Sequence, residues 1–453
     1  MPQEGPLTPE SFRSCTSLVP VTNDPAVLLT AQGQELLARL AAPGAAATPA
    51  FALAERLRRE YPADLVAAAM AQQELRRAAA AKFSRAAEML FTRAGYEQSS
   101  SETIARYRAA RLKDAPRVAD LCCGIGGDLI AHAAASAVLA VDRDATHARL
   151  ALHNAAVYDV ADQVRAVVAD VRDVALAGID AVFIDPARRS GPGTASAPTM
   201  PSSTVPSSTV PPSTVPPSTG RRFRPGASEP PLDWCTALTA QVEAVCIKAA
   251  PGLPEDQIPP GWEAEFIAES RDLKEAVLWS PGLATAPPDG ARGPRRATVL
   301  APSGSGRAPR CDTLVAREGA PVPLREPGEY LLDPSPAVTR AGLVEDLARV
   351  LGNDTAKIDP QIAFLTLDRD VRTPFARTLL VQYSAPWNEK SFAKRLRELG
   401  IGAVDIRRRG LAGDVDQIRR RLKLSGKTRA TVVITRVSDK PWGLICVDPL
   451  TLT

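Results

Sequence analysis

Three glycines, Gly124, Gly126 and Gly127, stand between an apolar run at residues 117–121 and a second apolar stretch that begins at Leu129. This order predicts a buried parallel strand, a tight turn and a helix. Such a turn brings backbone N–H groups and the positive end of a helix up to an anionic group. Glycine suits it because a side chain would block the close approach and resist the left-handed conformation. The stretch therefore predicts a binding site for a ligand that carries an anionic group.

Asp120 lies near the end of the first apolar run, and its negative charge restricts which ligands can bind there. A dinucleotide-binding turn would place its third glycine at position 129, where this chain has Leu129. A carboxylate at the strand end would repel a pyrophosphate, whereas it would attract the ammonium group of an amino acid. We therefore expect a ligand with an amino-acid part, and a nicotinamide oxidoreductase is the weaker interpretation. The alternative without a ligand is an ordinary turn between a strand and a helix.

Three more acids stand at the ends of predicted strands. The strand at 138–141 ends at Asp142, the strand at 164–169 ends in Asp170, and the strand at 180–184 ends in Asp185. Because ligands of open α/β sheets bind at the carboxyl ends of the strands, we expect these acids and Asp120 to line one crevice. Asp142, 22 positions after Asp120, is placed to accept ribose hydroxyls, and Asp170 is placed to accept an adenine amino group. Each acid taken alone is equally compatible with a loop.

The elements that must position these acids alternate between strand and helix, which is typical of an α/β domain with a mostly parallel sheet. We predict four regions, namely a helical N-terminal domain at 1–112, the α/β domain at 113–325, a connector at 326–377 and a small α+β domain at 378–453. Repeats of Pro, Ser and Thr predict a disordered insert at 191–220. The α/β domain is expected to continue with strands at 242–248, 264–270, 275–279 and 297–300, the last being its final strand. The connector is expected to contain one helix at 340–351.

Positive charge is concentrated near the end of the chain. Residues 391–430 contain twelve Lys and Arg against four acids, a net charge of +8, whereas the whole chain carries +4. A localised basic face predicts a polyanion partner, and the alternative is a solvated basic surface. The residues expected to contact that partner are Arg407, Arg408, Arg409 and Arg420.

The composition excludes several classes of protein. With 453 residues, 45% of them hydrophobic and 23% charged, the chain is typical of a soluble globular protein. It has no apolar run long enough for a membrane helix and no secretory leader, so we expect a cytoplasmic protein. Seven cysteines without a CxxC spacing and three histidines without a ligand cluster predict neither disulfides nor a metal site.

The run from Leu121 to Asp128, Leu-Cys-Cys-Gly-Ile-Gly-Gly-Asp, resembles motif I of class I S-adenosylmethionine-dependent methyltransferases. Residues 82–186 resemble RNA methyltransferases of the trimethylguanosine-synthase type. Over about 80–450, apart from the insert, the chain is most similar to bacterial class I methyltransferases with a C-terminal THUMP-like domain. The resemblance implies a Rossmann-like α/β domain with a mostly parallel seven-stranded sheet, and S-adenosylmethionine as cofactor.

The resemblance also assigns roles to single residues. It implies that the methionine end of the cofactor is held by Asp120, Cys122, Gly124, Gly126, Gly127 and Asp128. Asp142 with Arg143 would serve the ribose, and Asp170 with Val171 the adenine.

Asp185 and Pro186 occupy the place of the (Asp/Asn/Ser)-Pro-Pro-aromatic motif of amino-group methyltransferases, and we expect both to be catalytic. In that motif a side-chain oxygen and a backbone carbonyl accept the hydrogens of the target amine. Here Ala187 replaces the second proline and Arg188 the aromatic residue. Substrate contacts are expected from Phe91, Arg93, Tyr96, Arg188 and Arg189.

The leading hypothesis is a methyltransferase that acts on an exocyclic amine of an RNA base, with RNA as partner of the basic C-terminal domain. The alternatives are a methyltransferase of a small molecule or protein, and a non-catalytic RNA-binding protein that keeps the fold. A cysteine nucleophile is disfavoured because Cys122 and Cys123 lie beneath the expected cofactor and Cys246 lies in a predicted strand.

Overall fold

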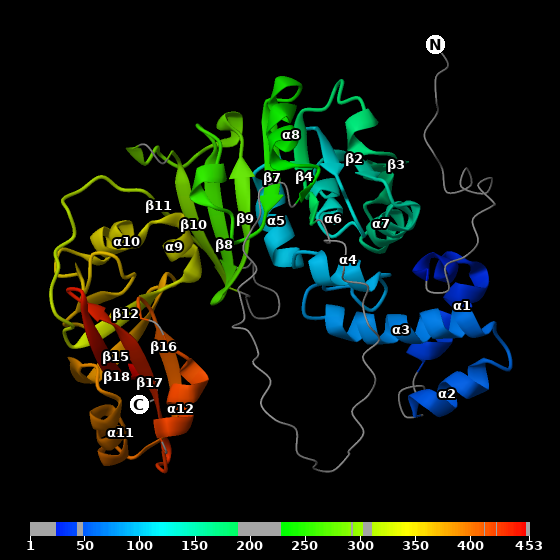
Figure 1. Ribbon diagram of the computed structural model, residues 1–453. Coiled ribbons are helices and arrows are strands. Elements are labelled where there is room, and N and C mark those ends of the chain that lie inside the picture. Colours follow the sequence, from blue (N-terminus) through cyan, green and yellow to red (C-terminus); the bar gives the residue numbers. More distant parts are fainter. Residues whose placement is uncertain are drawn as a thin grey trace, which may run out of the picture. The chain divides into compact units, whose positions relative to one another are not determined.

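The computed structural model describes residues 24–42, 49–188, 228–290, 293–301, 310–411, 413–422 and 424–449 (Figure 1). The chain divides into two compact units, Met1–Pro259 and Pro260–Thr453, which we describe separately. The division falls inside the α/β domain predicted at 113–325. The predicted repeat insert at 191–220 lies outside the described residues.

Helices open the first unit, as predicted. They are η2 (Pro25–Leu29), α1 (Ala31–Ala41), α2 (Ala50–Leu57), α3 (Ala63–Ala79), α4 (Arg93–Gln98) and α5 (Glu102–Ala110). Ser101 caps α5 by accepting the N–H of Ile104. The core of these helices also contains Ile125, Ile130 and Leu150, which belong to the glycine turn and the helices after it. The N-terminal helices therefore share one core with the predicted ligand site.

Five parallel strands form the sheet of the first unit, and their bounds are β1 (Arg117–Leu121), β2 (Ala137–Asp142), β3 (Val164–Val168), β4 (Ala181–Ile184) and β7 (Ala244–Ala249). Their order is β7-β4-β1-β2-β3. The connections include α6 (Leu129–Ala133), α7 (Ala145–Val157), α8 (Leu232–Ala237) and the short turns η4 (Ala161–Gln163), η5 (Val171–Asp173), η6 (Leu238–Ala240) and η7 (Glu255–Gln257). This arrangement confirms the predicted α/β fold. It also brings the ends of β1, β2, β3 and β4 to one edge.

A two-stranded ribbon follows β4. It pairs β5 (Ala187–Arg188) with β6 (Ser228–Glu229) in antiparallel register. The residues between the two strands, 189–227, include the predicted substrate residue Arg189 and lie outside the described residues.

The second unit begins with β8 (Glu263–Glu269), β9 (Asp272–Trp279), β10 (Arg295–Ala301) and β11 (Arg310–Val315), in the order β11-β10-β8-β9, with η8 (Pro281–Leu283) after β9. The strand at 297–300 is therefore not the final one, because β11 pairs with it in antiparallel register. The single helix predicted at 340–351 is wrong. The chain forms α9 (Pro336–Ala341) and α10 (Val344–Leu351), interrupted where Gly342 adopts a φ of 76°.

A second sheet completes this unit, with strands β12 (Tyr330–Pro334), β13 (Ala356–Lys357), β14 (Leu365–Leu367), β15 (Ala376–Pro386), β16 (Ile401–Arg408), β17 (Thr428–Val437) and β18 (Lys440–Val447). Their order is β13-β14-β12-β15-β18-β17-β16. Residues 326–377, predicted as a connector, instead supply three of these strands.

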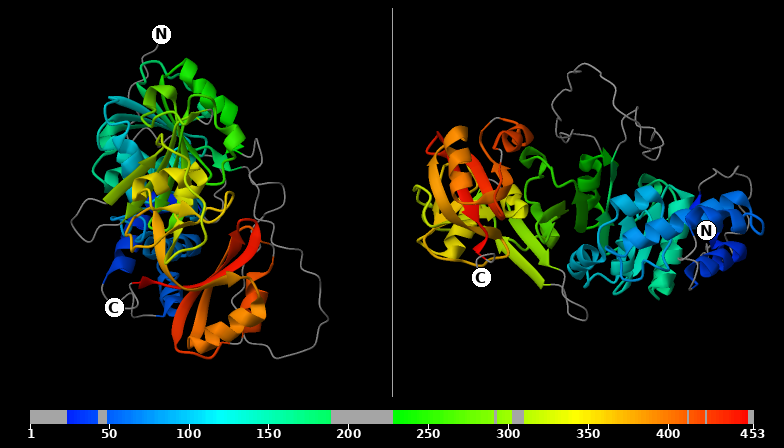
Figure 2. Two further views of the ribbon diagram at one scale, coloured as in Figure 1. Left: turned by 90° about the vertical axis from the view of Figure 1, so that its left-hand side faces the viewer. Right: turned by 90° about the horizontal axis from the view of Figure 1, so that it is seen from below.

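Two helices carry part of the basic segment at 391–430, namely α11 (Glu389–Glu398) and α12 (Val415–Leu422), and both pack on one face of this sheet (Figure 2). Successive side chains of β17 point to opposite faces of the sheet, so this strand contributes apolar residues to the cores on both faces. Val432 and Ile434 pack with the helices, whereas Val433 belongs to a second core with Leu331 and Phe364.

Candidate functional site

The glycine turn has the conformation that its sequence predicted. Gly124 and Gly126 have φ angles of 54° and 85°, a region that disfavours other residues. A Cβ on Gly126 would lie 3.0 Å from the Cα of Ala151 in α7, so this glycine permits close packing. A Cβ on Gly124 would meet no described atom within 4 Å. Gly124 therefore faces open space, which a ligand can occupy.

Asp120 is a buried acid at the end of β1. Its side chain is fully buried, and both carboxylate oxygens lack a hydrogen-bond partner among the residues that the structure describes. Burial, and then the nearby carboxylates Asp128, Asp185 and Asp142, raise its pKa well above the ordinary value. A cation brought next to Asp120 would satisfy both oxygens and the charge. The environment therefore fits the amino group of an amino-acid ligand.

Asp128, expected at the methionine end of the cofactor, is bound to the protein itself. Its carboxylate accepts a hydrogen bond from Arg108 of α5, a side chain with no exposed surface. Burial opposes the charge of Asp128, but Arg108, Lys248 and His132 outweigh it, and the pKa of Asp128 is lowered. Arg108 also donates to Ser100 over 3.0 Å and lies 5.2 Å from the centre of the Phe183 ring. Asp128 therefore joins α5 to the glycine turn.

Asp142 is fixed in place at the end of β2. Its Oδ2 accepts the N–H of Gly124 over 2.9 Å, and its Oδ1 accepts the N–H of Asp144 over 2.9 Å. Nδ1 of His147 lies 3.6 Å from the same Oδ1. Burial works against ionisation, but His147 and the two N–H donors prevail and lower the pKa of Asp142. The carboxylate is thus ionised and oriented beside the turn, and Arg143 is exposed next to it.

Asp170 lies at the same sheet edge, but it is not among the carboxylates that raise the pKa of Asp120. It caps η5, where its Oδ1 accepts the N–H of Arg172 over 2.9 Å. Its Oδ2 lies 3.3 Å from Nη1 of Arg172, which also binds Glu229 of β6. The Asp170 side chain is 40% exposed, and Val171 is buried beneath it. The strand-end acids are therefore gathered in part, with Asp120, Asp142 and Asp185 in mutual electrostatic reach.

Asp185 has a partner that the sequence analysis did not predict. Its Oδ2 accepts a hydrogen bond of 2.6 Å from Nζ of Lys248, near the end of β7. The backbone N–H of Asp185 donates to the carbonyl of Leu121, which joins this residue to the end of β1. The sequence carried a signal for Lys248, because it is a charged residue at the end of an apolar strand, as each of the four acids is. Pro186 follows Asp185 and precedes β5.

Contrary to the prediction from the sequence, the structure does not place Phe91 where it could contact a substrate. Its ring is fully buried, 5.9 Å from the ring of Phe83, and cannot contact a substrate. The side-chain amide of Gln72 binds both the N–H and the carbonyl of Phe91, over 3.0 and 2.6 Å, and holds the segment against the core.

The helix after Phe91 lies against the glycine turn. A Cβ on Gly95 would come within 2.5 Å of the Ile125 side chain, so glycine is needed for this contact. Arg93 is exposed, 3.8 Å from Glu74, and Tyr96 is half-buried under the ammonium of Lys82. Arg93 and Tyr96 thus keep accessible surface, whereas Phe91 does not. Arg188 lies in β5, opposite Ser228.

The predicted RNA-binding arginines of the second unit divide into two groups. Arg407 and Arg420 are exposed, and Arg408 is half-buried. Arg409 instead lies against the interior, with Nη2 2.8 Å from Asp333, Nη1 2.6 Å from the carbonyl of Ala363 and its guanidinium over the Phe364 ring. Arg409 therefore contributes to the fold, and its side chain is 30% exposed.

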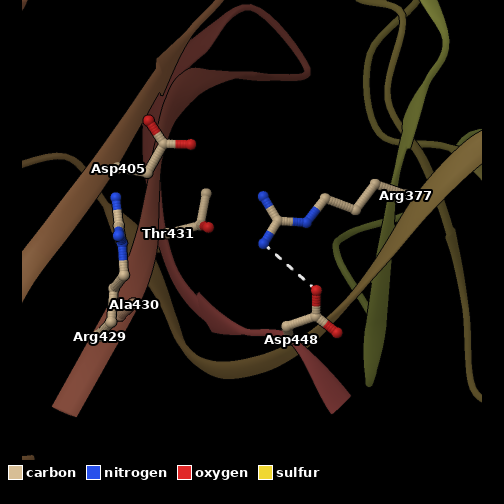
Figure 3. Close-up of a pocket in the computed structure, with 6 residues that line it drawn as sticks. All are labelled: Arg377, Asp405, Arg429, Ala430, Thr431 and Asp448. Carbon is tan, nitrogen blue, oxygen red and sulfur yellow. Dashed lines mark hydrogen bonds and ion pairs between the residues drawn. The ribbon is translucent and has the colours of Figure 1, made fainter. Parts of the chain in front are cut away.

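A small pocket of about 170 Å³ lies beside this region, lined by Arg377, Asp405, Arg429, Ala430, Thr431 and Asp448. Figure 3 shows Arg377 and Asp448 across the pocket from Asp405 and Arg429, and Arg377 lies 3.4 Å from Asp448. Two arginines and two aspartates balance each other here.

None of the helices described is long and apolar enough to cross a membrane. Within the same part of the chain, no group of three or more His, Cys, Asp and Glu is arranged to hold a metal ion.

Comparison with known proteins gives matches for three segments. Residues 115–194 match a family described as RNA cap guanine-N2 methyltransferase, and residues 376–447 match one described as THUMP domain-like. Residues 22–79 match a domain of unknown function.

Whole-chain similarity points the same way. Two proteins of Mycobacterium tuberculosis, named uncharacterized S-adenosylmethionine-dependent methyltransferases, are 34% identical to this chain over 365 residues, which is 77% of this chain and 85% of theirs. The crystal structure of a protein from Porphyromonas gingivalis, named as a methyltransferase, has a similar fold. Its TM-score is 0.61 at 19% identity, and the similarity covers 85% of this chain and 91% of that one.

Proposed function

Because the chain belongs to the S-adenosylmethionine-dependent methyltransferases, we propose that it methylates an exocyclic amine of a base in RNA. The family fixes S-adenosylmethionine as the cofactor, whereas the acceptor is our proposal. The support for the methyl-transfer site is Asp120, a buried and unpartnered carboxyl group next to an open glycine turn, at the sheet edge where Asp185 also lies. The support for RNA is the match of residues 115–194.

The residues fit the parts of the cofactor. Asp120 would bind the ammonium group, and Asp142, held by two backbone N–H groups, would accept the ribose hydroxyls. The open side of Gly124 leaves room for the cofactor to approach the backbone. Asp170 would accept the adenine amino group, with Val171 beneath the ring. Bound S-adenosylmethionine supplies an electrophilic methyl group on a sulfonium sulfur.

On the acceptor side, Asp185 and the carbonyl of Pro186 would accept the hydrogens of the target amine. These hydrogen bonds direct the nitrogen lone pair away from the acids and toward the methyl group. Asp185 is suited to this because its backbone is tied to β1 and its side chain is 33% exposed. Most of the rate would come from positioning, since the displacement needs no covalent intermediate with the protein.

RNA as the acceptor rests on two observations. One is the match of residues 115–194 to a family of RNA methyltransferases, together with the THUMP-like match at 376–447. The other is the exposure of Arg407, Arg420 and Arg429 on the basic segment, where phosphates can reach them. Several basic residues there pair with acids, as Arg407 does with Asp405 over 3.3 Å. Such surface pairs are weak and exchange readily for phosphate contacts.

Mass spectrometry of RNA nucleosides tests the proposal. A methylated nucleoside should be absent from the RNA of cells that lack the gene and should return when the gene is restored. The purified protein should then transfer radiolabelled methyl from S-adenosylmethionine into RNA from the deletion strain. Identical nucleoside profiles with and without the gene, and no transfer to that RNA, would refute RNA as the acceptor.

A further inference from the structure

Lys248 places an ammonium group inside the predicted transfer centre. Its Nζ lies 2.6 Å from Oδ2 of Asp185, 3.4 Å from the carbonyl of Gln98 and 4.0 Å from Oδ2 of Asp128. It therefore touches the loop of the proposed catalytic acid, the end of α4 and the end of the glycine turn. β7, which carries Lys248, is the parallel neighbour of β4, and the pairing of Ile247 with Ile184 sets Lys248 beside Asp185.

The two members of this pair differ in exposure. The Lys248 side chain is 11% exposed, whereas that of Asp185 is 33% exposed. Lys248 is thus the inner partner, and a substrate meets Asp185 first. Lys248 occupies Oδ2, and no residue in the described part of the chain donates to the other oxygen, Oδ1. One oxygen is held by the protein, and the other is presented outward.

The carboxyl groups closest to Lys248 are compensated without a substrate. Asp128 is paired with Arg108 and Asp185 with Lys248, while burial and nearby carboxylates raise the pKa of Asp120 and favour its neutral form. Asp142 is ionised, but two backbone N–H groups and His147 hold it. An alkylammonium group brought to Asp185 would add a positive charge next to Lys248, at a carboxylate that this lysine already neutralises. The amine of a nucleobase is uncharged at neutral pH, and it can donate an N–H to Oδ1 without this repulsion.

From this geometry, and resting on the proposed function, we infer that Lys248 is a specificity-determining residue that acts through Asp185. It orients the carboxylate toward an uncharged aromatic amine, and it excludes alkylammonium groups such as those of lysine side chains and polyamines. The substrate class of the site is thus an amino nucleobase, and protein or polyamine acceptors are disfavoured.

The pair also has a role while the methyl group moves. The amine lone pair forms the nitrogen–carbon bond, the carbon–sulfur bond breaks with its electron pair going to sulfur, and one N–H proton passes through Asp185 to water. The nitrogen carries positive charge until that proton leaves. Lys248 keeps the accepting oxygen fixed during this step, because rotation of the carboxylate would break the 2.6 Å hydrogen bond.

The test compares three variants of the full chain with the wild type. Lys248→Met removes the charge and keeps the length, Lys248→Arg keeps the charge, and Lys274→Met removes an exposed lysine that is paired with Asp272 elsewhere. Methyl transfer is measured with total RNA from a strain lacking the gene and with spermidine. Calorimetry with S-adenosylhomocysteine and thermal denaturation report on cofactor binding and folding.

We expect Lys248→Met to lower kcat on RNA by about 100-fold, the size of effect that a lost electrostatic contact at a reacting centre produces. Its affinity for S-adenosylhomocysteine should stay within about threefold of the wild type, since Lys248 acts on the acceptor side. Lys248→Arg should recover at least about a tenth of the wild-type rate, and Lys274→Met should match the wild type. The ratio of spermidine to RNA methylation should rise in Lys248→Met.

Two results would overturn the role of Lys248. One is a Lys248→Met variant that keeps the wild-type kcat and selectivity. The other is a wild type that methylates spermidine as fast as RNA. If Lys248→Met loses its thermal transition, Lys248→Arg decides the matter, because a folded but inactive or unselective arginine variant also contradicts the inference. A wild type that transfers no methyl to RNA refutes the proposed function instead.

Discussion

Replacing Asp120 with asparagine removes the charge from the proposed cofactor site and leaves its shape unchanged. The burial of Asp120 and the neighbouring carboxylates raise its pKa, which favours the neutral form of this residue in the cofactor-free protein. Asparagine is close in size and polarity to that form. We therefore expect Asp120→Asn to fold as the wild type does and to bind S-adenosylmethionine poorly.

The size of the loss follows from the contact removed. A hydrogen bond between a carboxylate and an ammonium group contributes about 1.5–3 kcal/mol, which corresponds to a decrease in affinity of roughly 10- to 150-fold. The upper part of this range is expected, because Asp120 is fully buried and water cannot replace the lost acceptor.

The dependence on pH gives a second readout. A cationic ligand stabilises the ionised form of Asp120, so binding should release a proton wherever the free protein is protonated. Affinity should therefore rise with pH until the raised pKa of the free protein is reached. Calorimetry of S-adenosylmethionine binding in buffers of different ionisation enthalpy gives the number of protons released on binding. Asp120→Asn should abolish this release.

Stability should change in the opposite sense. The folded state holds the Asp120 proton more tightly than the unfolded chain does. Above pH 3.8 the unfolded chain loses this proton first, so the free energy of unfolding falls as the pH rises toward the raised pKa of the folded state. Asp120→Asn removes this loss and should be at least as stable as the wild type at neutral pH. Asp162→Asn, at an exposed acid, is the matched control and should change neither binding nor stability. Equal affinity and equal proton release in Asp120→Asn and wild type would refute the assigned role.

Three further predictions concern the surroundings of the site. Arg108→Met leaves Asp128 buried beside an apolar side chain, and should lower the free energy of unfolding by about 3–5 kcal/mol in chemical denaturation; an unchanged midpoint would contradict the structural role of this pair. Asp142→Asn should weaken S-adenosylmethionine binding by roughly tenfold in calorimetry and leave RNA affinity alone, and a loss of RNA binding instead would argue against a ribose contact. Arg407→Ala combined with Arg408→Ala should weaken RNA binding and make the slope of log affinity against log salt shallower by about 1–2, measured by fluorescence anisotropy, whereas an unchanged slope would show that these arginines contact no phosphate.

The acids of the site could be predicted because each depends on local sequence. A short apolar run predicts a buried strand, and the residue at its end lies at the edge of the sheet wherever the strand is placed. Asp120, Asp142 and Asp185 were found in this way. The glycines of the turn followed from the same reasoning, and the positive φ angles of Gly124 and Gly126 agree with it.

The partners of these acids could not be predicted, because they come from distant parts of the chain. Arg108 lies 20 residues from Asp128, and Lys248 lies 63 residues from Asp185. Arg108 is one of several arginines on its helix, and only the packing of α5 against the glycine turn distinguishes it. The short strands β13 and β14 were missed for a related reason, since two or three residues carry no recognisable alternation and gain their stability from the strands beside them.

Phe91 shows how a local pattern can mislead. Phe91 was predicted to contact the substrate, yet its segment is tightly held inside the protein. Gln72 binds the backbone of Phe91, and Asn154 binds the N–H and carbonyl of Leu90 over 2.8 and 3.0 Å and also the carbonyl of Ile125. These two amides replace the backbone partners that a strand would have supplied, so the aromatic ring can be buried without a regular element around it.

Several carboxyl groups at one sheet edge would repel one another if all were ionised without partners. Asp142 keeps its charge, which two backbone N–H groups and His147 stabilise. The other three acids avoid the repulsion in three ways, since Arg108 neutralises Asp128, Lys248 neutralises Asp185, and the raised pKa of Asp120 favours its protonated form. Protonation of Asp120 is easily reversed, because a proton leaves readily when a cation arrives. The side chains of Arg108 and Lys248, in contrast, are held in place by their own packing. Asp120 is therefore the position at which a cationic ligand can enter without breaking an ion pair. For this reason cofactor binding should depend on pH through Asp120, while Asp128 and Asp185 keep their partners throughout.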